Sequence, residues 1–126
     1  MIVAGFGFRE AAQVTSLQDA LENARGAFEV DGLATLTDKA EHPAFRAFAQ
    51  AQGAEVFTVS EASCAAAHTT TQSAAARLAR RTGSVAEATA LVAAGPGATL
   101  ITQRFVSADR MATCALAQST QKEGQT

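Results

Sequence analysis

The sequence lacks a long apolar run, an excess of basic charge and a second pair of cysteines. No apolar segment among its 126 residues approaches the roughly 18 to 20 residues that a membrane-spanning helix requires. The formal net charge of -2 at pH 7 excludes the broad basic surface of a general nucleic-acid binder. Cys64 and Cys114 stand far apart, which argues against a disulfide framework and a zinc knuckle and favours two reduced, buried thiols.

The start of the chain also lacks the features of a secretion signal. Met1 leads directly into a short apolar segment, with no basic region and no small-residue cleavage site. We therefore expect a cytoplasmic location. With 48% hydrophobic and 17% charged residues, the composition is typical of a soluble globular domain. The length fits a single domain, which we assign to residues 1–118, followed by a polar tail at 119–126.

In the N-terminal half, apolar periodicity predicts alternating strands and helices. Strands are expected at residues 2–6, 33–37 and 54–59. Gly5 and Gly7 are predicted to form a tight turn after the first strand, and Ser16 is predicted to cap the helix that follows. A second helix is predicted to begin at Pro43 and to stop at Gly53.

In the C-terminal half, residues 60–82 are rich in alanine and threonine. They predict a short helix, a loop and a second helix over 72–81. Ser84 and Glu87 have the spacing of a capping box, in which the two side chains satisfy free backbone N–H groups at the start of a helix. We expect that helix to end near Gly95.

The last segments predict an antiparallel hairpin. Its strands are expected at residues 98–105 and 111–117, joined by the polar residues 107–110. The whole pattern therefore predicts an α/β fold, a single three-layer domain with a mostly parallel sheet and a C-terminal antiparallel hairpin. The last strand is expected at the edge of that sheet.

Two glycines after a strand suggest a dinucleotide-binding turn, because glycines let a phosphate approach the backbone at a helix N-terminus. The third glycine of that pattern would stand at position 10, where Glu10 would repel a pyrophosphate. The chain also has no P-loop signature. We therefore expect no nucleotide and no other cofactor.

Polar residues follow the first two predicted strands, at the edge where open α/β sheets bind ligands. Arg9 could hold a carboxylate through two parallel hydrogen bonds, or could pair with Glu10 at the surface. Residues 37–41, Thr-Asp-Lys-Ala-Glu, could orient a polar ligand, perform acid–base chemistry or form a solvated turn. Parallel neighbours present their following loops on one edge, so we predict that Arg9 and residues 37–41 converge. We expect a ring of polar side chains around this ligand site, completed by Ser84 or Glu87 and by Arg104.

Other polar groups give weaker functional signals. Cys64 and His68 would share one face of a helix, as a metal pair or a nucleophile and its base would, but no third ligand is evident. We expect no metal site. His42 is expected to cap or flank the helix that begins at Pro43. The residues expected to form a solvated helix face are Arg77, Arg80 and Arg81.

Four segments occur in a characteristic order along the chain. They are residues 5–9 (GFGFR), 36–41 (LTDKAE), 83–88 (GSVAEA), and Arg104 ahead of 111–117 (MATCALA). In this combination they resemble the CobE family of cobalamin biosynthesis, which is similar to the C-terminal domain of CbiG. The resemblance covers roughly residues 2–117. The chain departs from it at Phe8, where a cysteine often stands, and at Glu10, where a second arginine often stands, so a catalytic thiol is absent there.

The resemblance implies a small α/β domain in corrin ring construction, where CbiG proteins open a lactone of a cobalt-precorrin and release a two-carbon aldehyde. It implies a precorrin-type tetrapyrrole as ligand and other corrin-pathway enzymes as partners. Such a macrocycle is fringed with carboxylates and needs cations at the rim of its site and an apolar floor. The candidate cations are Arg9, Lys39 and Arg104. The candidates for the floor are Phe6, Phe8 and Phe105.

Three functions are compatible with this resemblance. The first is a carrier or accessory factor that binds a precorrin through Gly5, Gly7, Arg9, Thr37, Ser84, Glu87 and Arg104. The second is a lactone or C–C hydrolase in which Asp38 or Glu41 activates water and Lys39 or Arg9 stabilises the oxyanion. The third is a structural adaptor between pathway enzymes. The alanine-rich helices would also permit the close packing of a homodimer.

Overall fold

In the computed structural model, residues 1–60, 85–95, 97–102 and 104–119 are described. Their helices and strands are, in chain order, β1 (Ile2–Phe8), α1 (Val14–Arg25), β2 (Gly32–Leu36), α2 (Pro43–Gln52), β3 (Glu55–Val59), α5 (Val85–Ala94), β4 (Thr99–Leu100), β5 (Phe105–Val106) and β6 (Ala112–Gln118). Several predicted features lie outside the described residues, namely the helix at 72–81, Cys64, His68, Arg77, Arg80, Arg81, Ser84 and residues 120–126.

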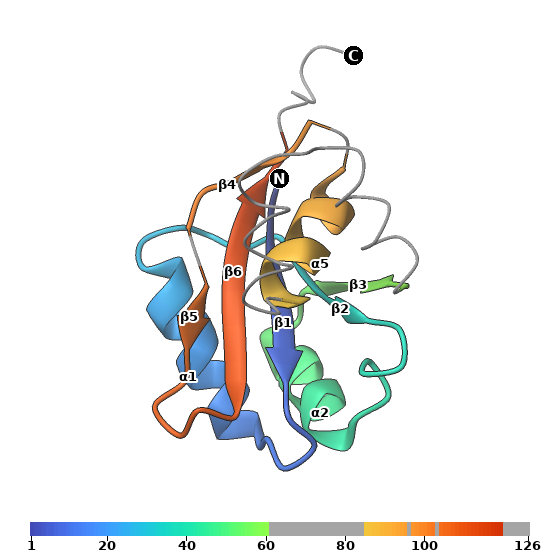
Figure 1. Cartoon of the computed structure of the whole chain (residues 1–126), viewed down its shortest axis with the longest axis vertical. Helices are drawn as coiled ribbons and strands as arrows, with labels where there is room; N and C mark the ends of the chain where they lie inside the picture. The colour runs from blue at the N-terminus through green and yellow to red at the C-terminus, as the bar shows by residue number, and fades with distance from the viewer. Residues whose placement is uncertain (61–84, 96, 103, 120–126) are drawn as a thin grey trace.

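The strands form one mixed sheet in the order β3-β2-β1-β6-β4, with β5 also paired to β6 (Figure 1). β1, β2 and β3 are parallel neighbours, whereas β6 is antiparallel to β1 from one end to the other. The prediction that the last strand lies at the edge is therefore wrong. Residues 114–117 of β6 are all buried and apolar, which is typical of a strand with both faces covered. The predicted strand 98–105 is divided into β4 and β5, which both pair with β6.

Helices cover both faces of the sheet, which confirms the predicted three-layer α/β arrangement (Figure 1). On one face, α1 and α2 pack against alternate residues of β1. There the ring of Phe6 lies 5.3 Å from that of Phe48 and 6.0 Å from that of Phe45. On the other face, α5 packs against Val3 and Ala34. No helix in the described ranges combines the length and apolar character needed to cross a membrane.

Gly5 and Gly7 lie within β1, so the predicted glycine turn is wrong. Both glycines face α5. A Cβ atom at Gly5 would lie only 2.6 Å from the backbone nitrogen of Ala90 and 2.6 Å from Thr89 Oγ1. A Cβ at Gly7 would meet its nearest neighbour, Thr113 Oγ1, at 3.2 Å. Gly5 therefore allows α5 to approach the sheet more closely than any larger residue would.

The ends of the first two helices follow local signals, with one correction. α1 begins at Val14, so Ser16 is its third residue and not its cap; the Ser16 hydroxyl accepts a hydrogen bond from the backbone N–H of Gln13 at 3.1 Å. α2 begins at Pro43, and Gly53 stops it after Gln52, as predicted. Gly53 has a φ of 68°, the left-handed conformation that commonly ends a helix.

Replacing Gly5 with alanine tests the packing of α5 on β1. The new methyl group would overlap the α5 backbone, so we expect the free energy of unfolding to fall by about 1–3 kcal/mol, the usual cost of overpacking. Gly7→Ala is the matched control, because its methyl group would meet tight contacts without overlap and would reduce the entropy of the unfolded chain. Urea unfolding followed by circular dichroism measures both variants. Equal stability of the two would contradict the packing role of Gly5.

Candidate functional site

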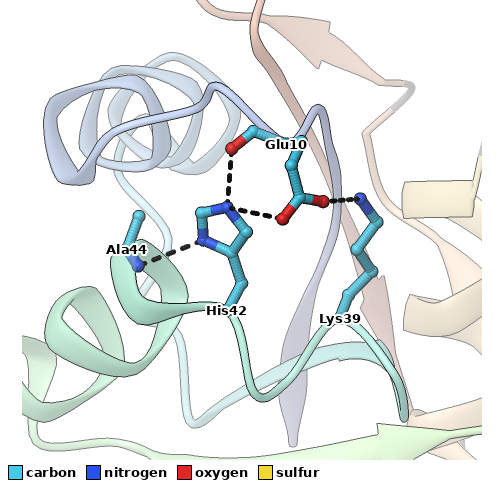
Figure 2. A network of polar contacts seen from close by, with 4 residues as sticks. All are labelled: Glu10, Lys39, His42 and Ala44. Carbon is cyan, nitrogen blue, oxygen red and sulfur yellow. Dashed lines mark hydrogen bonds and ion pairs between the residues drawn. The ribbon is translucent and has the colours of Figure 1, made fainter.

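The loops that follow β1 and β2 meet at the carboxyl edge of the sheet (Figure 2). Glu10, two residues after β1, reaches the β2–α2 loop. Its carboxylate lies 3.8 Å from Lys39 Nζ and 3.8 Å from His42 Nε2. The segments that follow the two parallel strands therefore converge, and Glu10 makes the contact rather than Arg9, which precedes it.

His42 uses both of its ring nitrogens: Nδ1 caps α2, and Nε2 fastens the β2–α2 loop to the loop after β1 (Figure 2). Its Nδ1 accepts a hydrogen bond from the backbone N–H of Ala44 at 3.1 Å, which caps α2 and confirms the predicted capping role. Because Nδ1 is the acceptor, the neutral ring donates through Nε2 to the carbonyl oxygen of Glu10, at 2.7 Å. The His42 side chain is only 10% exposed, so this residue belongs to the framework of the site.

Lys39 is held by an aromatic ring as well as by Glu10. Its Nζ lies 5.2 Å from the centre of the Phe8 ring, within the range of a cation–π interaction. Phe8 in turn stacks on Phe45 at 5.7 Å and contacts the edge of the His42 ring. The ammonium group therefore has a defined position at the edge of the sheet.

The predicted apolar floor is wrong for two of its three residues. Phe6 and Phe8 are buried in the core beneath α2, because alternate residues of β1 face the same side of the sheet. Phe105, the third, is 38% exposed on β5. The rings of Phe6 and Phe8 therefore belong to the core that supports Lys39, and they do not offer a surface to a ligand.

The other predicted residues of the two loops are exposed. Arg9 is fixed through its backbone, whose N–H donates to the carbonyl oxygen of Met111 at 2.9 Å. Thr37 and Asp38 are exposed at the end of β2. Glu41 extends toward α2, where its Oε1 lies 3.9 Å from Arg46 Nη1 in an ion pair between two largely exposed side chains.

Glu87 and Arg104 lie on the other face of the sheet. The first residues of α5 lie beside Gly7, so this helix begins near the same carboxyl edge. Glu87, in the first turn of α5, is buried, and its Oε2 accepts a hydrogen bond from the backbone N–H of Arg104 at 3.3 Å. These two predicted neighbours are in contact with each other, on the α5 side, whereas Lys39 lies over Phe8 on the α2 side.

The hairpin loop between β5 and β6, predicted as a polar connection, is a cluster of hydrogen bonds centred on Asp109. Asp109 accepts hydrogen bonds from the hydroxyls of Ser107 (2.5 Å) and Ser16 (2.6 Å) and from the backbone N–H of Met111 (3.0 Å). These donors, Ser107 foremost, lower the pKa of Asp109 below its usual value. Asp19 of α1 also accepts from the backbone N–H of Ala108, at 2.6 Å. The loop is thus fastened to the first turns of α1.

The described ranges contain no group of three or more His, Cys, Asp or Glu side chains arranged to hold a metal ion. Cys114 is fully buried, as expected for a structural thiol, and its burial raises its pKa well above the usual value. A buried thiol with a raised pKa is a poor nucleophile. Among the residues that the structure describes, the loops after β1 and β2 bring cations and carboxylates to this edge.

Residues 2–117 match a protein family described as "Cobalamin synthesis G C-terminus". Among solved structures, the chain is similar to CobE, a protein from the cobalamin (vitamin B12) biosynthetic pathway, with 30% identity, a TM-score of 0.74, and coverage of 93% of this chain and 89% of that one. It is similar to the cobalamin biosynthesis protein chiG from Agrobacterium tumefaciens str. C58, with 30% identity, a TM-score of 0.72, and coverage of 96% and 100%.

A third solved structure shares the fold alone. It is a cobalamin biosynthesis protein G homologue from Sulfolobus solfataricus, with 18% identity and a TM-score of 0.70. The match covers 96% of this chain and 37% of that longer one. No curated protein matches the chain.

The lowered pKa of Asp109 predicts how stability depends on pH. A carboxyl group whose pKa is lower in the folded state stabilises the fold above its unfolded pKa of about 3.9, and this stabilisation is lost as the pH falls through the folded value. We therefore expect Asp109→Ala to lower the Tm at pH 7, and the difference from the unaltered chain to shrink below about pH 4. Thermal unfolding over a pH series measures this. Asp38→Ala, at an exposed aspartate, is the control; an equal effect there would contradict the assignment.

Proposed function

The chain belongs to the cobalamin synthesis G C-terminus family of cobalamin biosynthesis proteins, and from this premise we propose that it binds a precorrin-type tetrapyrrole intermediate. It acts as a carrier or accessory factor for a ring-modifying step, and its partners are other enzymes of the corrin pathway. The ligand lies at the carboxyl edge of the sheet, where its acidic side chains meet Arg9 and Lys39. Thr37, exposed at the end of β2, completes the contacts.

The observation that supports this proposal is that two separate loops each place a cation at the carboxyl edge of the sheet. Arg9 follows β1 and Lys39 follows β2, and the two strands are parallel neighbours. A macrocycle with carboxylates along its rim is recognised by cations that are separated in space and fixed in position. Phe8 fixes the ammonium group of Lys39, and the backbone bond to Met111 fixes the start of the Arg9 loop.

Glu10 does not prevent Lys39 from binding a ligand. The separation of 3.8 Å exceeds hydrogen-bond length, and the Glu10 side chain is 88% exposed. Exposed ion pairs of this kind contribute about 0–1 kcal/mol, whereas a hydrogen bond to a charged group contributes about 1.5–3 kcal/mol. A ligand carboxylate that hydrogen-bonds Lys39 directly would therefore displace Glu10.

Binding fits the geometry of the predicted catalytic residues better than hydrolysis does. A carboxylate that acts as a general base near neutral pH is usually buried, because burial raises its pKa. Asp38 and Glu41 are both exposed, and Glu41 pairs with Arg46 on α2. The alternative, a lactone or C–C hydrolase that uses Asp38, Lys39 or Glu41, predicts single-turnover release of acetaldehyde from a lactone-bearing precorrin. If the unaltered chain releases acetaldehyde and Asp38→Ala does not, the chain is a hydrolase and not a carrier.

Substitution of Arg9 tests the proposed binding site. The probe is uroporphyrin III, a stable tetrapyrrole with acetate and propionate side chains, and binding is followed by its absorption spectrum. Loss of one charge-assisted contact should weaken binding roughly ten- to a hundredfold in Arg9→Ala, with little change in Tm, because Arg9 is exposed.

Arg46→Ala is the matched control, since Arg46 is also exposed but lies on α2. It should bind the probe as the unaltered chain does. The proposal is wrong if the unaltered chain shows neither a spectral change with uroporphyrin III nor co-elution with enzymatically prepared precorrins. It is also wrong if Arg9→Ala unfolds the protein, since Arg9 would then be a structural residue.

A further inference from the structure

Arg110 has an unusual backbone conformation for its residue type. Its φ is 64°, and in the described part of the chain no other residue except glycine has a positive φ. Its N–H donates to the carbonyl oxygen of Ser107 at 2.9 Å, and the N–H of Ser107 donates to that of Ala112 at 2.8 Å. This is a tight hairpin loop whose last position is left-handed, where glycine or asparagine is usual. The local backbone therefore disfavours the residue that stands there.

The rest of this loop is held rigidly. Asp109 is bonded to Ser107 and Ser16, and the N–H of Ala108 is bonded to Asp19, so the loop is fixed to α1. Arg110 is exposed, and its side chain makes no ion pair or hydrogen bond with the described residues. The carboxylate of the preceding residue, Asp109, already accepts hydrogen bonds from hydroxyl and backbone N–H groups. The loop thus presents an arginine whose charge no described neighbour uses.

The pairing of β6 with β1 places this arginine at the edge described above. Phe8 pairs with Ala112, and the N–H of Arg9 donates to the carbonyl oxygen of Met111 at 2.9 Å. Arg110 therefore stands next to the end of the ladder, beside the loop that carries Arg9. Three successive strands of the sheet, β2, β1 and β6, each have a cation next to one end. Lys39 follows β2, Arg9 follows β1, and Arg110 precedes β6. Adjacent strands lie about 4.8 Å apart, so these strands cover about 10 Å of the edge.

We propose that Arg110 is a further ligand-binding residue of this edge, and that it holds a carboxylate next to the one bound by Arg9. The inference rests on the proposed function, and it defines the ligand class more narrowly, as a molecule with several carboxylates spaced along one rim. A rigid loop reduces the entropy lost when the guanidinium engages its partner. An arginine kept at a position that favours glycine is consistent with such a role, since backbone strain is often retained at binding sites.

Arg110→Gly separates binding from folding. Glycine relieves the unfavourable φ, so Tm should stay unchanged or rise, while the affinity for uroporphyrin III should fall roughly ten- to a hundredfold. Arg110→Lys keeps the charge and should recover part of this loss. Coproporphyrin III, in which methyl groups replace the acetates, should show a smaller loss because it offers fewer carboxylates to the edge.

The outcomes distinguish this inference from the function on which it rests. If Arg110→Gly binds uroporphyrin III as tightly as the unaltered chain does while Arg9→Ala binds more weakly, the role of Arg110 is overturned and the proposed function stands. A lower Tm in Arg110→Gly would also overturn it, since the arginine would then be structural. If the unaltered chain binds neither this probe nor precorrins, the proposed function itself fails.

Discussion

The parallel pairing of β1 with β2 is the constraint on which the candidate site depends. Its register, with Val3 opposite Gly32 and Gly5 opposite Ala34, brings both strands to their carboxyl ends at one edge. The loops that follow them must then lie side by side. The antiparallel pairing of β6 with β1 adds the hairpin loop to the same edge. Three segments far apart in the chain thus supply cations to one strip of surface, and the aromatic core below β1 supports that strip.

Local signals in the sequence predicted most of the elements. Pro43 and Gly53 marked both ends of α2, because proline and glycine constrain the backbone wherever they occur. The glycines of β1 suggest a turn from the sequence alone, since the same residue serves turns and close contacts, and only the packing of α5 distinguishes the two. The central position of β6 also depends on contacts distant in sequence, although its buried apolar run was a usable signal.

The convergence of the two loops followed from strand order, but the contacts within it did not. Glu10 meets Lys39 and His42 because of the path each loop takes after its strand, which no spacing in the sequence specifies. The burial of Phe6 and Phe8 could have been predicted, because aromatic and glycine residues alternate in β1 with the period of a strand. The fastening of the hairpin to α1 joins residues 93 positions apart, and only the folded chain shows it.

The most direct test of a ligand site at this edge is a map of amide chemical shifts in the labelled chain as uroporphyrin III is added. Binding at this edge should cause the largest changes in the loops after β1 and β2 and in the β5–β6 hairpin, centred on Arg9, Lys39 and Arg110. The opposite end of the sheet, where β4 pairs with the end of β6, should change little. Saturable changes confined to that opposite end, or to the exposed edge of β3, would contradict a ligand site at the carboxyl edge.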